Sequence, residues 1–174
     1  MIQSTTRYFI TLTALSFAVY FLTGCAAPDK TPEKADLVEA NIKAYSNTWD
    51  EIMNKGNLDM FNDSNFVKDV VMHIRPSNVV GIDSMRAYYA NFLTGFSDIR
   101  FTIVDIFGQG DKLVKYWNFK GTHTGVFFGI PPTGKSVDLE GTTLVRMSGG
   151  KIAEEQDFYD NLDFFTQLGL VPGQ

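Results

Sequence analysis

The sequence predicts an α+β domain in which helices cover one face of a curved antiparallel sheet. Three observations lead to this prediction. Apolar residues recur at helical spacing in the first half of the chain, most clearly over residues 35–54. From Asp98 onward the apolar period changes to two, which is typical of strands. Glycine-containing turns separate the strand-like segments that follow.

The first helix is the strongest helical pattern in the chain. Between Ala35 and Asn54 the apolar residues fall at spacings of one, three and four, which predicts an amphipathic helix that ends at Gly56. The segment LDMFNDSN that follows predicts a short second helix or a turn.

A strand and a third helix are predicted next. The segment VKDVVMHI is rich in β-branched residues and predicts a strand that stops at Pro76. Residues 81–92 predict a third helix, with Asp83 or Ser84 as its N-cap.

The second half of the domain reads as strands joined by turns. The predicted strands cover residues 99–103, 113–120, 137–147 and 152–160. Turns at 108–111 and 148–151 join neighbouring strands, and the proline-containing loop 129–134 interrupts the pairing. A short helix from Leu162 to Leu168 closes the domain.

The N-terminus has the composition of a secretory signal. Residues 1–24 contain one cation, no acid and an apolar run from Tyr8 to Leu22. The stretch Leu22-Thr23-Gly24-Cys25 resembles the lipobox of bacterial lipoproteins, in which the cysteine thiol accepts the lipid. We therefore expect a signal peptide over 1–24, a lipidated tether over 25–33 and one domain over 34–174. The alternatives are an ordinary secretory peptide or an uncleaved membrane anchor.

The expected location follows from this resemblance. Cys25 is the only cysteine of the chain, so an internal disulfide is excluded. Acylation would account for a single cysteine at the end of an export signal. Lipid attached there would hold the domain at a membrane of the cell envelope. Residue 26 is alanine rather than aspartate, which favours the outer membrane if the host is Gram-negative.

The net charge of the chain limits the classes of partner. The 174 residues carry a formal charge of −5, and cleavage before Cys25 would change it to −6 because Arg7 is lost. An acidic surface without a basic stripe repels phosphate backbones, which argues against nucleic acid as a partner.

Two carboxylates of the segment IAEEQDFYD share one strand face. Because side chains alternate along a strand, Glu155 and Asp157 point one way while Glu154 and Gln156 point the other. In a dry pocket the two acids would titrate as a coupled pair, with the pKa of one member raised. The alternative is a solvated edge. We interpret Glu154 as a surface charge and Asp160 as a helix cap.

From His73 to Leu170 the order of features carries a family resemblance. The matching residues are His73, Gly81-Ile82, 96–98, Gly110-Asp111, GTHTG (121–125), GIPPTGK (129–135), Arg146, 150–152, Asp157 and 167–169. This order is similar to that of the SnoaL-like polyketide cyclases, which have the nuclear-transport-factor-2-like fold. The resemblance implies a cone-shaped half-barrel: a curved antiparallel sheet wrapped over about three N-terminal helices, with a short C-terminal helix.

The resemblance also implies a site and a chemistry. A carboxylate at Asp157 would act as general acid/base in an intramolecular aldol ring closure that needs no cofactor, assisted by His73 or Glu155. The expected ligand-pocket residues are Trp49, Tyr88, Phe92, Trp117, Phe119 and Thr143. Polar side chains that known cyclases carry on strand 137–147 are replaced by Gly141 and Thr143. An enolate-stabilising partner must therefore come from elsewhere.

Other chemistries receive little support from the sequence. The domain has two histidines and no cysteine after residue 25. A metal site would need His73, His123 and Asp157 to converge from three strands, so we expect no metal and no cofactor.

Three hypotheses follow. The first is an envelope-anchored, cofactor-independent cyclase or isomerase that acts on a small apolar carbonyl compound. The second is a lipoprotein that binds a small hydrophobic ligand without changing it. The third is a structural role in which the open sheet face forms a homodimer.

Overall fold

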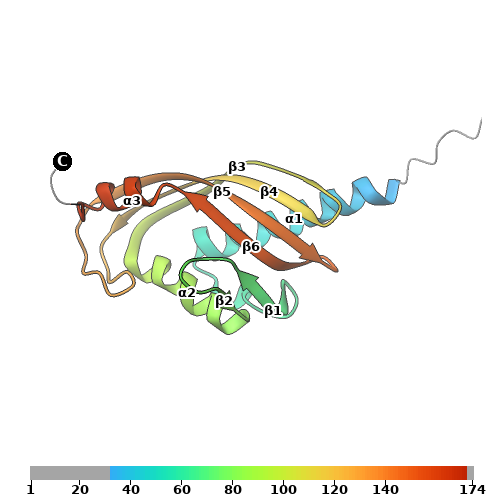
Figure 1. The fold of residues 1–174 in the computed structure, drawn as a ribbon, viewed down its shortest axis with the longest axis horizontal. Coiled ribbons are helices and arrows are strands. Elements are labelled where there is room, and N and C mark those ends of the chain that lie inside the picture. The colour runs from blue at the N-terminus through green and yellow to red at the C-terminus, as the bar shows by residue number, and fades with distance from the viewer. Residues whose placement is uncertain (1–31, 172–174) are drawn as a thin grey trace, which may run out of the picture. The chain divides into compact units, whose positions relative to one another are not determined.

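The computed structural model describes residues 32–171, with side chains described from residue 35 (Figure 1). The predicted signal, most of the predicted tether and Cys25 lie outside these residues. In chain order the elements are α1 (Pro32–Lys55), η1 (Leu58–Met60), β1 (Phe66–Met72), β2 (Val79–Val80), α2 (Ile82–Gly95), β3 (Phe96–Gln109), β4 (Lys112–His123), β5 (Ser136–Ser148), β6 (Lys151–Tyr159) and α3 (Asn161–Gln167). Within residues 32–171, no helix combines the length and apolarity that crossing a membrane requires.

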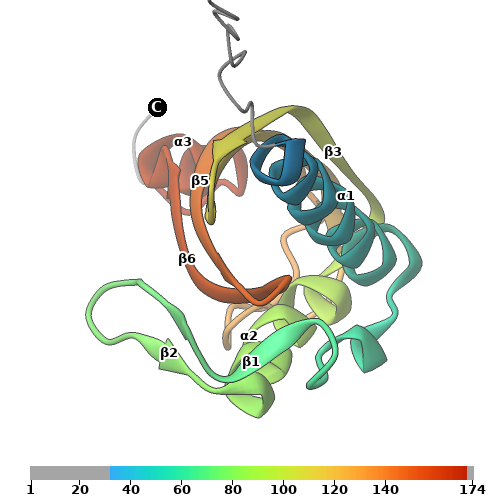
Figure 2. The same cartoon turned by 90° about the vertical axis from the view of Figure 1, so that its right-hand side faces the viewer.

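The α+β prediction is confirmed. Six strands form one curved, unclosed sheet in the order β2-β1-β6-β5-β4-β3. The sheet curls around α1, and α2 lies beside β1 and β2 (Figure 2). The predicted second helix is the single 3₁₀ turn η1.

Helix α1 supplies one side of the core. Tyr45, Trp49, Ile52 and Met53 are buried, and their spacing places them on one face of the helix. The helix ends at Lys55, and Gly56 follows in the left-handed conformation with φ of 67°. The sequence pattern therefore located this helix and its end correctly.

The sheet is mixed rather than wholly antiparallel. β1 pairs with β6 in parallel, and β2, which the sequence did not predict, pairs with β1. The β1–β6 pairing joins residues more than 80 positions apart in the sequence, so neither the local pattern nor the turn residues predict it.

The parallel pairing ends part-way along β6. Its last paired residues are Met72 and Glu155, and the His73 amide donates to the Glu155 carbonyl at 2.8 Å. Beyond this point β1 leaves the sheet, while β5 continues to pair with β6 through Tyr159. Among the described residues, the β6 edge from residue 156 to 159 therefore has no strand neighbour on the β1 side.

Helix caps account for two further predictions. Asp160 is the N-cap of α3, as predicted, because its side chain accepts from the amides of Leu162 and Asp163. The predicted cap of α2 is wrong: Gly81 occupies the N-cap position with φ of 88°, and no side chain bonds there.

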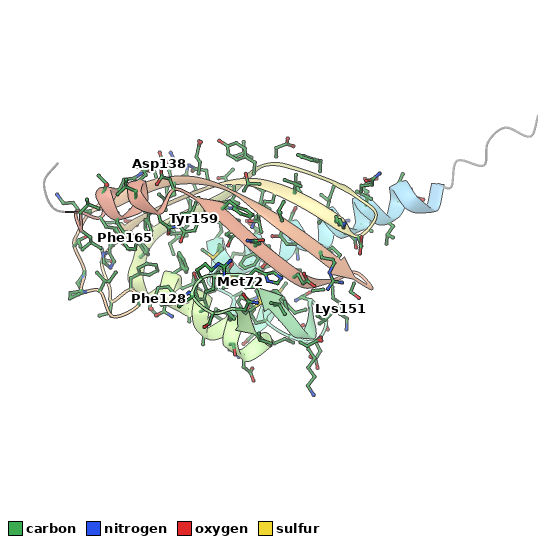
Figure 3. All side chains as sticks on the ribbon, viewed as in Figure 1. Met72, Phe128, Asp138, Lys151, Tyr159 and Phe165 are labelled. Atoms are coloured by element: carbon green, nitrogen blue, oxygen red, sulfur yellow. The ribbon has the colours of Figure 1, made fainter. Side chains whose placement is uncertain are left out.

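Side chains fill most of the space between the sheet and the two longer helices (Figure 3). Alternation along β4 and β5 sends every second residue inward. Gly141 is one of these inward positions, and a Cβ there would lie 2.3 Å from the Trp117 ring. The glycine lets this ring lie against β5 and form part of the inner wall.

Candidate functional site

A small cavity lies between the inner face of the sheet and helices α1 and α2. Its volume is about 60 Å³, and its walls are aromatic or aliphatic apart from Lys115 and Asp157. Five of the six predicted pocket residues line it: Trp49, Tyr88, Phe92, Trp117 and Phe119. The sixth, Thr143, contacts two of the lining residues.

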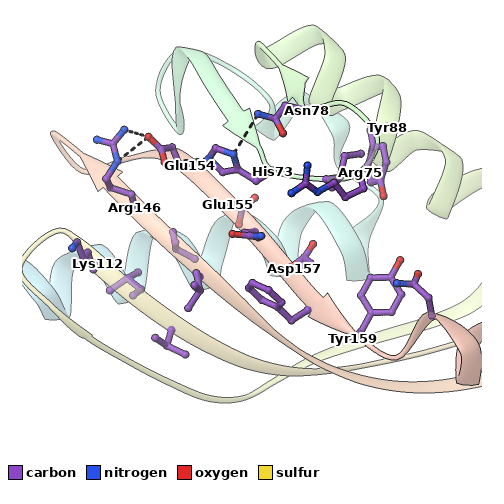
Figure 4. A pocket seen from close by; sticks show the side chains of 18 of the residues that line it. His73, Arg75, Asn78, Tyr88, Lys112, Arg146, Glu154, Glu155, Asp157 and Tyr159 are labelled. Atoms are coloured by element: carbon purple, nitrogen blue, oxygen red, sulfur yellow. Dashed lines mark hydrogen bonds and ion pairs between the residues drawn. The ribbon is translucent and has the colours of Figure 1, made fainter.

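A larger groove of about 960 Å³ lies outside the cavity, between residues 73–78 and the strands β4 to β6 (Figure 4). Tyr88, Asp157 and Tyr159 line both the groove and the cavity. These three residues form the junction, which we define as the place where the two spaces meet. The junction is at the edge of β6 that β1 leaves unpaired.

Asp157 is held at the junction by hydrogen bonds. The Thr143 hydroxyl donates to its Oδ1, and Trp117 Nε1 in turn donates to the Thr143 hydroxyl at 3.0 Å. Oδ2 lies 3.5 Å from the Tyr89 hydroxyl, at the limit of a hydrogen bond. One carboxylate oxygen is thus fixed, while the other is weakly engaged and available to accept a proton.

Glu155 shares the inner face with Asp157, as the alternation predicts, but lies deeper. Its side chain is 1% exposed, and its Oε1 accepts from the Tyr45 hydroxyl and from Trp49 Nε1 at 3.1 Å. Oε2 is buried and has no hydrogen-bond partner among the described residues. Burial raises the pKa of Glu155 to about 7, although the nearby Lys115 ammonium opposes the rise and Asp157 adds to it.

Lys115 is the charged residue that we did not predict for this site. It is 3% exposed, and its Nζ lies 4.9 to 5.2 Å from the ring centroids of Trp49, Phe101 and Tyr45. Burial lowers the pKa of Lys115, and the charges of Asp157 and Glu155 counteract part of this effect. Its inward position follows from the alternation Leu113, Lys115, Trp117, Phe119, so the signal was present in the sequence.

The tyrosines around the junction remain protonated donors. Burial raises the pKa of Tyr88, of Tyr89 and of Tyr159 above the ordinary value, and the negative charge of Asp157 adds to each rise. None of these hydroxyls is therefore a base near neutral pH.

His73 does not join the two carboxylates. Its side chain is 39% exposed, and its Nε2 lies 3.2 Å from Glu154 Oε2, on the sheet face opposite to Glu155. Arg146 Nε also donates to Glu154, at 3.0 Å, so Glu154 is a paired surface charge. His73 lines the groove rather than the cavity.

His123 lies elsewhere in the core. It is fully buried, its ring centroid is 5.2 Å from that of Phe96, and its Nδ1 accepts from the Thr133 amide at 3.3 Å. The two histidines and Asp157 do not converge. Within the described residues, no three His, Cys, Asp or Glu side chains are grouped so that they could hold a metal ion.

Comparison with known proteins finds a related sequence family and structures of similar fold. Residues 43–168 match the family model of the SnoaL-like polyketide cyclases. A candidate SnoaL-like polyketide cyclase from Jannaschia sp. CCS1 is similar in structure, with a TM-score of 0.71, 24% identity and coverage of 78% of this chain and 96% of that one. None of the curated proteins matches the sequence.

Two further solved structures show the same fold. AclR from Streptomyces galilaeus, a candidate hydroxylase, has a TM-score of 0.68 and 21% identity over 79% of this chain and 85% of its own. A protein of ketosteroid isomerase-like fold from Catenulispora acidiphila, bound to trimethylamine, has a TM-score of 0.61 and 19% identity over 72% and 92%. The curved sheet with its helices is thus the nuclear-transport-factor-2-like fold.

Proposed function

Because the chain belongs to the SnoaL-like polyketide cyclase family, we propose that it is a cofactor-independent cyclase or isomerase with Asp157 as general acid/base. Its substrate would be a small apolar carbonyl compound. The observation that supports this most is the position of Asp157, which a ligand can reach from the groove while its reacting end is enclosed by aromatic walls.

The reaction starts with proton transfer. Asp157 Oδ2 removes a proton from the carbon next to a carbonyl, and the resulting enolate attacks a second carbonyl of the same molecule. The hydrogen bond from Thr143 fixes the carboxylate so that Oδ2 keeps its direction. Glu155 would assist as a second carboxylate on the same face. Burial raises its own pKa to about 7, and the charge of Asp157 adds to that rise.

The size of the cavity limits what part of the substrate enters it. A cavity of about 150 Å³ is known to accept benzene, so 60 Å³ accommodates only a few heavy atoms. We therefore place one carbonyl end of the substrate in the cavity and the rest in the groove. Tyr88 and Tyr159 would flank the chain where it passes the junction.

A defined triketone tests this function. Diacetylacetone closes by an intramolecular aldol reaction to the aromatic ring of orcinol with loss of one water. The wild type should accelerate orcinol formation, followed by chromatography, and Asp157→Asn should not, because the amide cannot accept the proton. Equal rates with the wild type, the variant and buffer would contradict the proposal.

The second candidate function is binding without turnover. It is favoured by the predominance of aromatic side chains in the cavity and by the commitment of the Thr143 hydroxyl to Asp157. Both tryptophans of the chain line the cavity, so their fluorescence reports its occupancy. A fluorescence change with diacetylacetone that is equal in the wild type and Asp157→Asn, without ring closure, would support this alternative.

We also propose that the protein is exported and anchored to the cell envelope through lipid on Cys25. The support is the sequence of residues 1–25. Palmitate fed to cells should label the wild type and not Cys25→Ala. Equal labelling of the two would exclude lipid attachment at this cysteine.

A further inference from the structure

Three inward-facing residues form a row across the central strands of the sheet. Lys115 on β4 pairs with Thr143 on β5, and Thr143 pairs with Asp157 on β6. Because strands lie about 4.8 Å apart, the backbones of Lys115 and Asp157 are roughly 10 Å apart, with the short Thr143 side chain between them. Lys115 and Asp157 are also the two charged residues that line the cavity.

The Lys115 ammonium is not neutralised by a direct ion pair. Among the described residues, no carboxylate oxygen lies within 4.0 Å of its Nζ, and no hydrogen bond to another side chain is formed there. The charge is instead stabilised by the faces of three aromatic rings and, at longer range, by the two carboxylates. A buried cation held in this way keeps its N–H donors for a ligand.

The donors that contact Asp157 are already engaged, whereas the Tyr88 and Tyr159 hydroxyls line the cavity as neutral donors. Thr143 has one hydroxyl proton, which it donates to Asp157, and Trp117 donates to Thr143. The Tyr89 hydroxyl lies 3.5 Å from Asp157 Oδ2 and 3.5 Å from Met72 Sδ. Because Lys115 is the cationic residue among those lining the cavity, its ammonium is the strongest donor for an oxygen of a ligand there.

We propose that Lys115 is a further catalytic residue, whose ammonium binds the substrate carbonyl oxygen and stabilises the enolate that forms when Asp157 removes the α-proton. This inference rests on the function proposed above and specifies its substrate class as carbonyl compounds with an acidic α-hydrogen. The C–H bond breaks, its proton moves to Asp157 and its electron pair forms the enolate. Lys115 keeps its protons and contributes charge, as an oxyanion hole does.

The spacing of the two groups suits this chemistry. The base and the cation line one cavity but are too far apart to form an ion pair, so the Cα–C=O unit of a ligand can lie between them. The walls of the cavity are mostly apolar, which strengthens the attraction between the ammonium and an enolate. The arrangement also supplies the enolate-stabilising partner that strand 137–147 lacks.

The test uses acetylacetone, a β-diketone whose enolate is seen by near-ultraviolet absorbance. All measurements use Asp157→Asn as the host variant, into which the further substitutions are introduced. Its neutral amide represents the protonated acid that follows proton transfer. In this host we expect enolate to bind at least about tenfold more tightly than the neutral diketone, which lowers the apparent pKa of bound acetylacetone by about one or more. Adding Lys115→Met should abolish that preference.

A matched control uses the same strand. Lys120 is exposed on β4 and pairs with Asp138 at 2.7 Å, so Lys120→Met in the same host should keep the preference for enolate. Lys115→Arg, which retains the charge, should restore part of it. Circular dichroism on each variant identifies any that fails to fold, and the arginine variant then decides between loss of charge and loss of structure.

The outcomes separate this inference from the proposed function. Equal enolate preference with and without Lys115, or no binding of the enolate by the host variant, would overturn it. Borohydride trapping of a covalent adduct on Lys115, detected by mass spectrometry, would also overturn it, because the residue would then act as an amine nucleophile. Ring closure at the wild-type rate in Lys115→Met, lost in Asp157→Asn, would leave the proposed function standing alone.

Discussion

Replacing Glu155 by glutamine should make the protein more stable at alkaline pH. The carboxylate is buried among Tyr45, Trp49 and the inner strands, with one oxygen unpartnered among the described residues. Glutamine has nearly the same shape as the protonated acid, and its carbonyl can accept the two hydrogen bonds that reach Oε1. The substitution therefore keeps the shape of the side chain and removes the buried charge, including its long-range attraction for Lys115.

The size of the effect follows from the pKa of Glu155. Its ordinary value is 4.5 and burial raises it to about 7. Below pH 4.5 the group is protonated in the folded and the unfolded chain, so it costs nothing. As pH rises to 7 the unfolded chain releases the proton and the folded chain retains it, which lowers the free energy of unfolding. A difference of one in pKa is worth about 1.4 kcal/mol, so the loss above pH 7 is about 3 kcal/mol.

Urea denaturation between pH 5 and pH 9 measures this loss, and the comparison with Glu155→Gln cancels the other titrating groups. The two proteins should differ little near pH 5, and the variant should be more stable by about 2 to 3 kcal/mol at pH 8.5. Glu154→Gln is the control, because Glu154 pairs with Arg146 on the outer face and should give no alkaline gain. Parallel pH curves for the wild type and Glu155→Gln would show that Glu155 is not a buried, reluctantly ionised acid.

Three further substitutions test the support of the site. Gly141→Ala places a Cβ against the Trp117 ring, so it should lower the free energy of unfolding by about 2 kcal/mol and change the tryptophan fluorescence. An unchanged free energy of unfolding would contradict the close packing of Gly141 and Trp117. Thr143→Val removes the donor to Asp157 and the acceptor of Trp117. It should lower the free energy of unfolding, measured by urea denaturation, by about 1 to 3 kcal/mol. An unchanged free energy of unfolding would mean that neither bond persists in solution. Asp160→Ala removes the cap of α3 and should lower the free energy of unfolding by about 1 kcal/mol. Thermal unfolding compares it with Asp160→Asn, which keeps a capping oxygen. Equal melting temperatures of the two variants would argue against the cap.

Local patterns in the sequence were enough for the elements other than β2 and for the direction of most side chains. Alternation placed Glu155 and Asp157 on one face, and the same rule applied to β4 would have placed Lys115 beside them. Lys115 was missed because a lysine in an amphipathic strand is ordinarily assigned to the solvated side.

The sequence does not predict that Glu155 is buried while Asp157 is accessible from the groove. Glu155 lies where β1 still covers the edge of β6, whereas Asp157 lies two residues beyond, where the edge is open. That boundary is set by the parallel pairing of β1 with β6, a contact between distant parts of the chain. The same contact carries His73 to the outer face, beside Glu154, so its predicted assistance to Asp157 is not supported by its position.

The proposed function requires that Asp157 is a base that a carbonyl compound can reach. Acetone is small enough to test this alone, since deuterium uptake by its methyl groups in D₂O requires only proton removal and return. Nuclear magnetic resonance should show exchange catalysed by the wild type and reduced by about a hundredfold or more in Asp157→Asn. Exchange at the same rate in both proteins would contradict the role of Asp157 as the base.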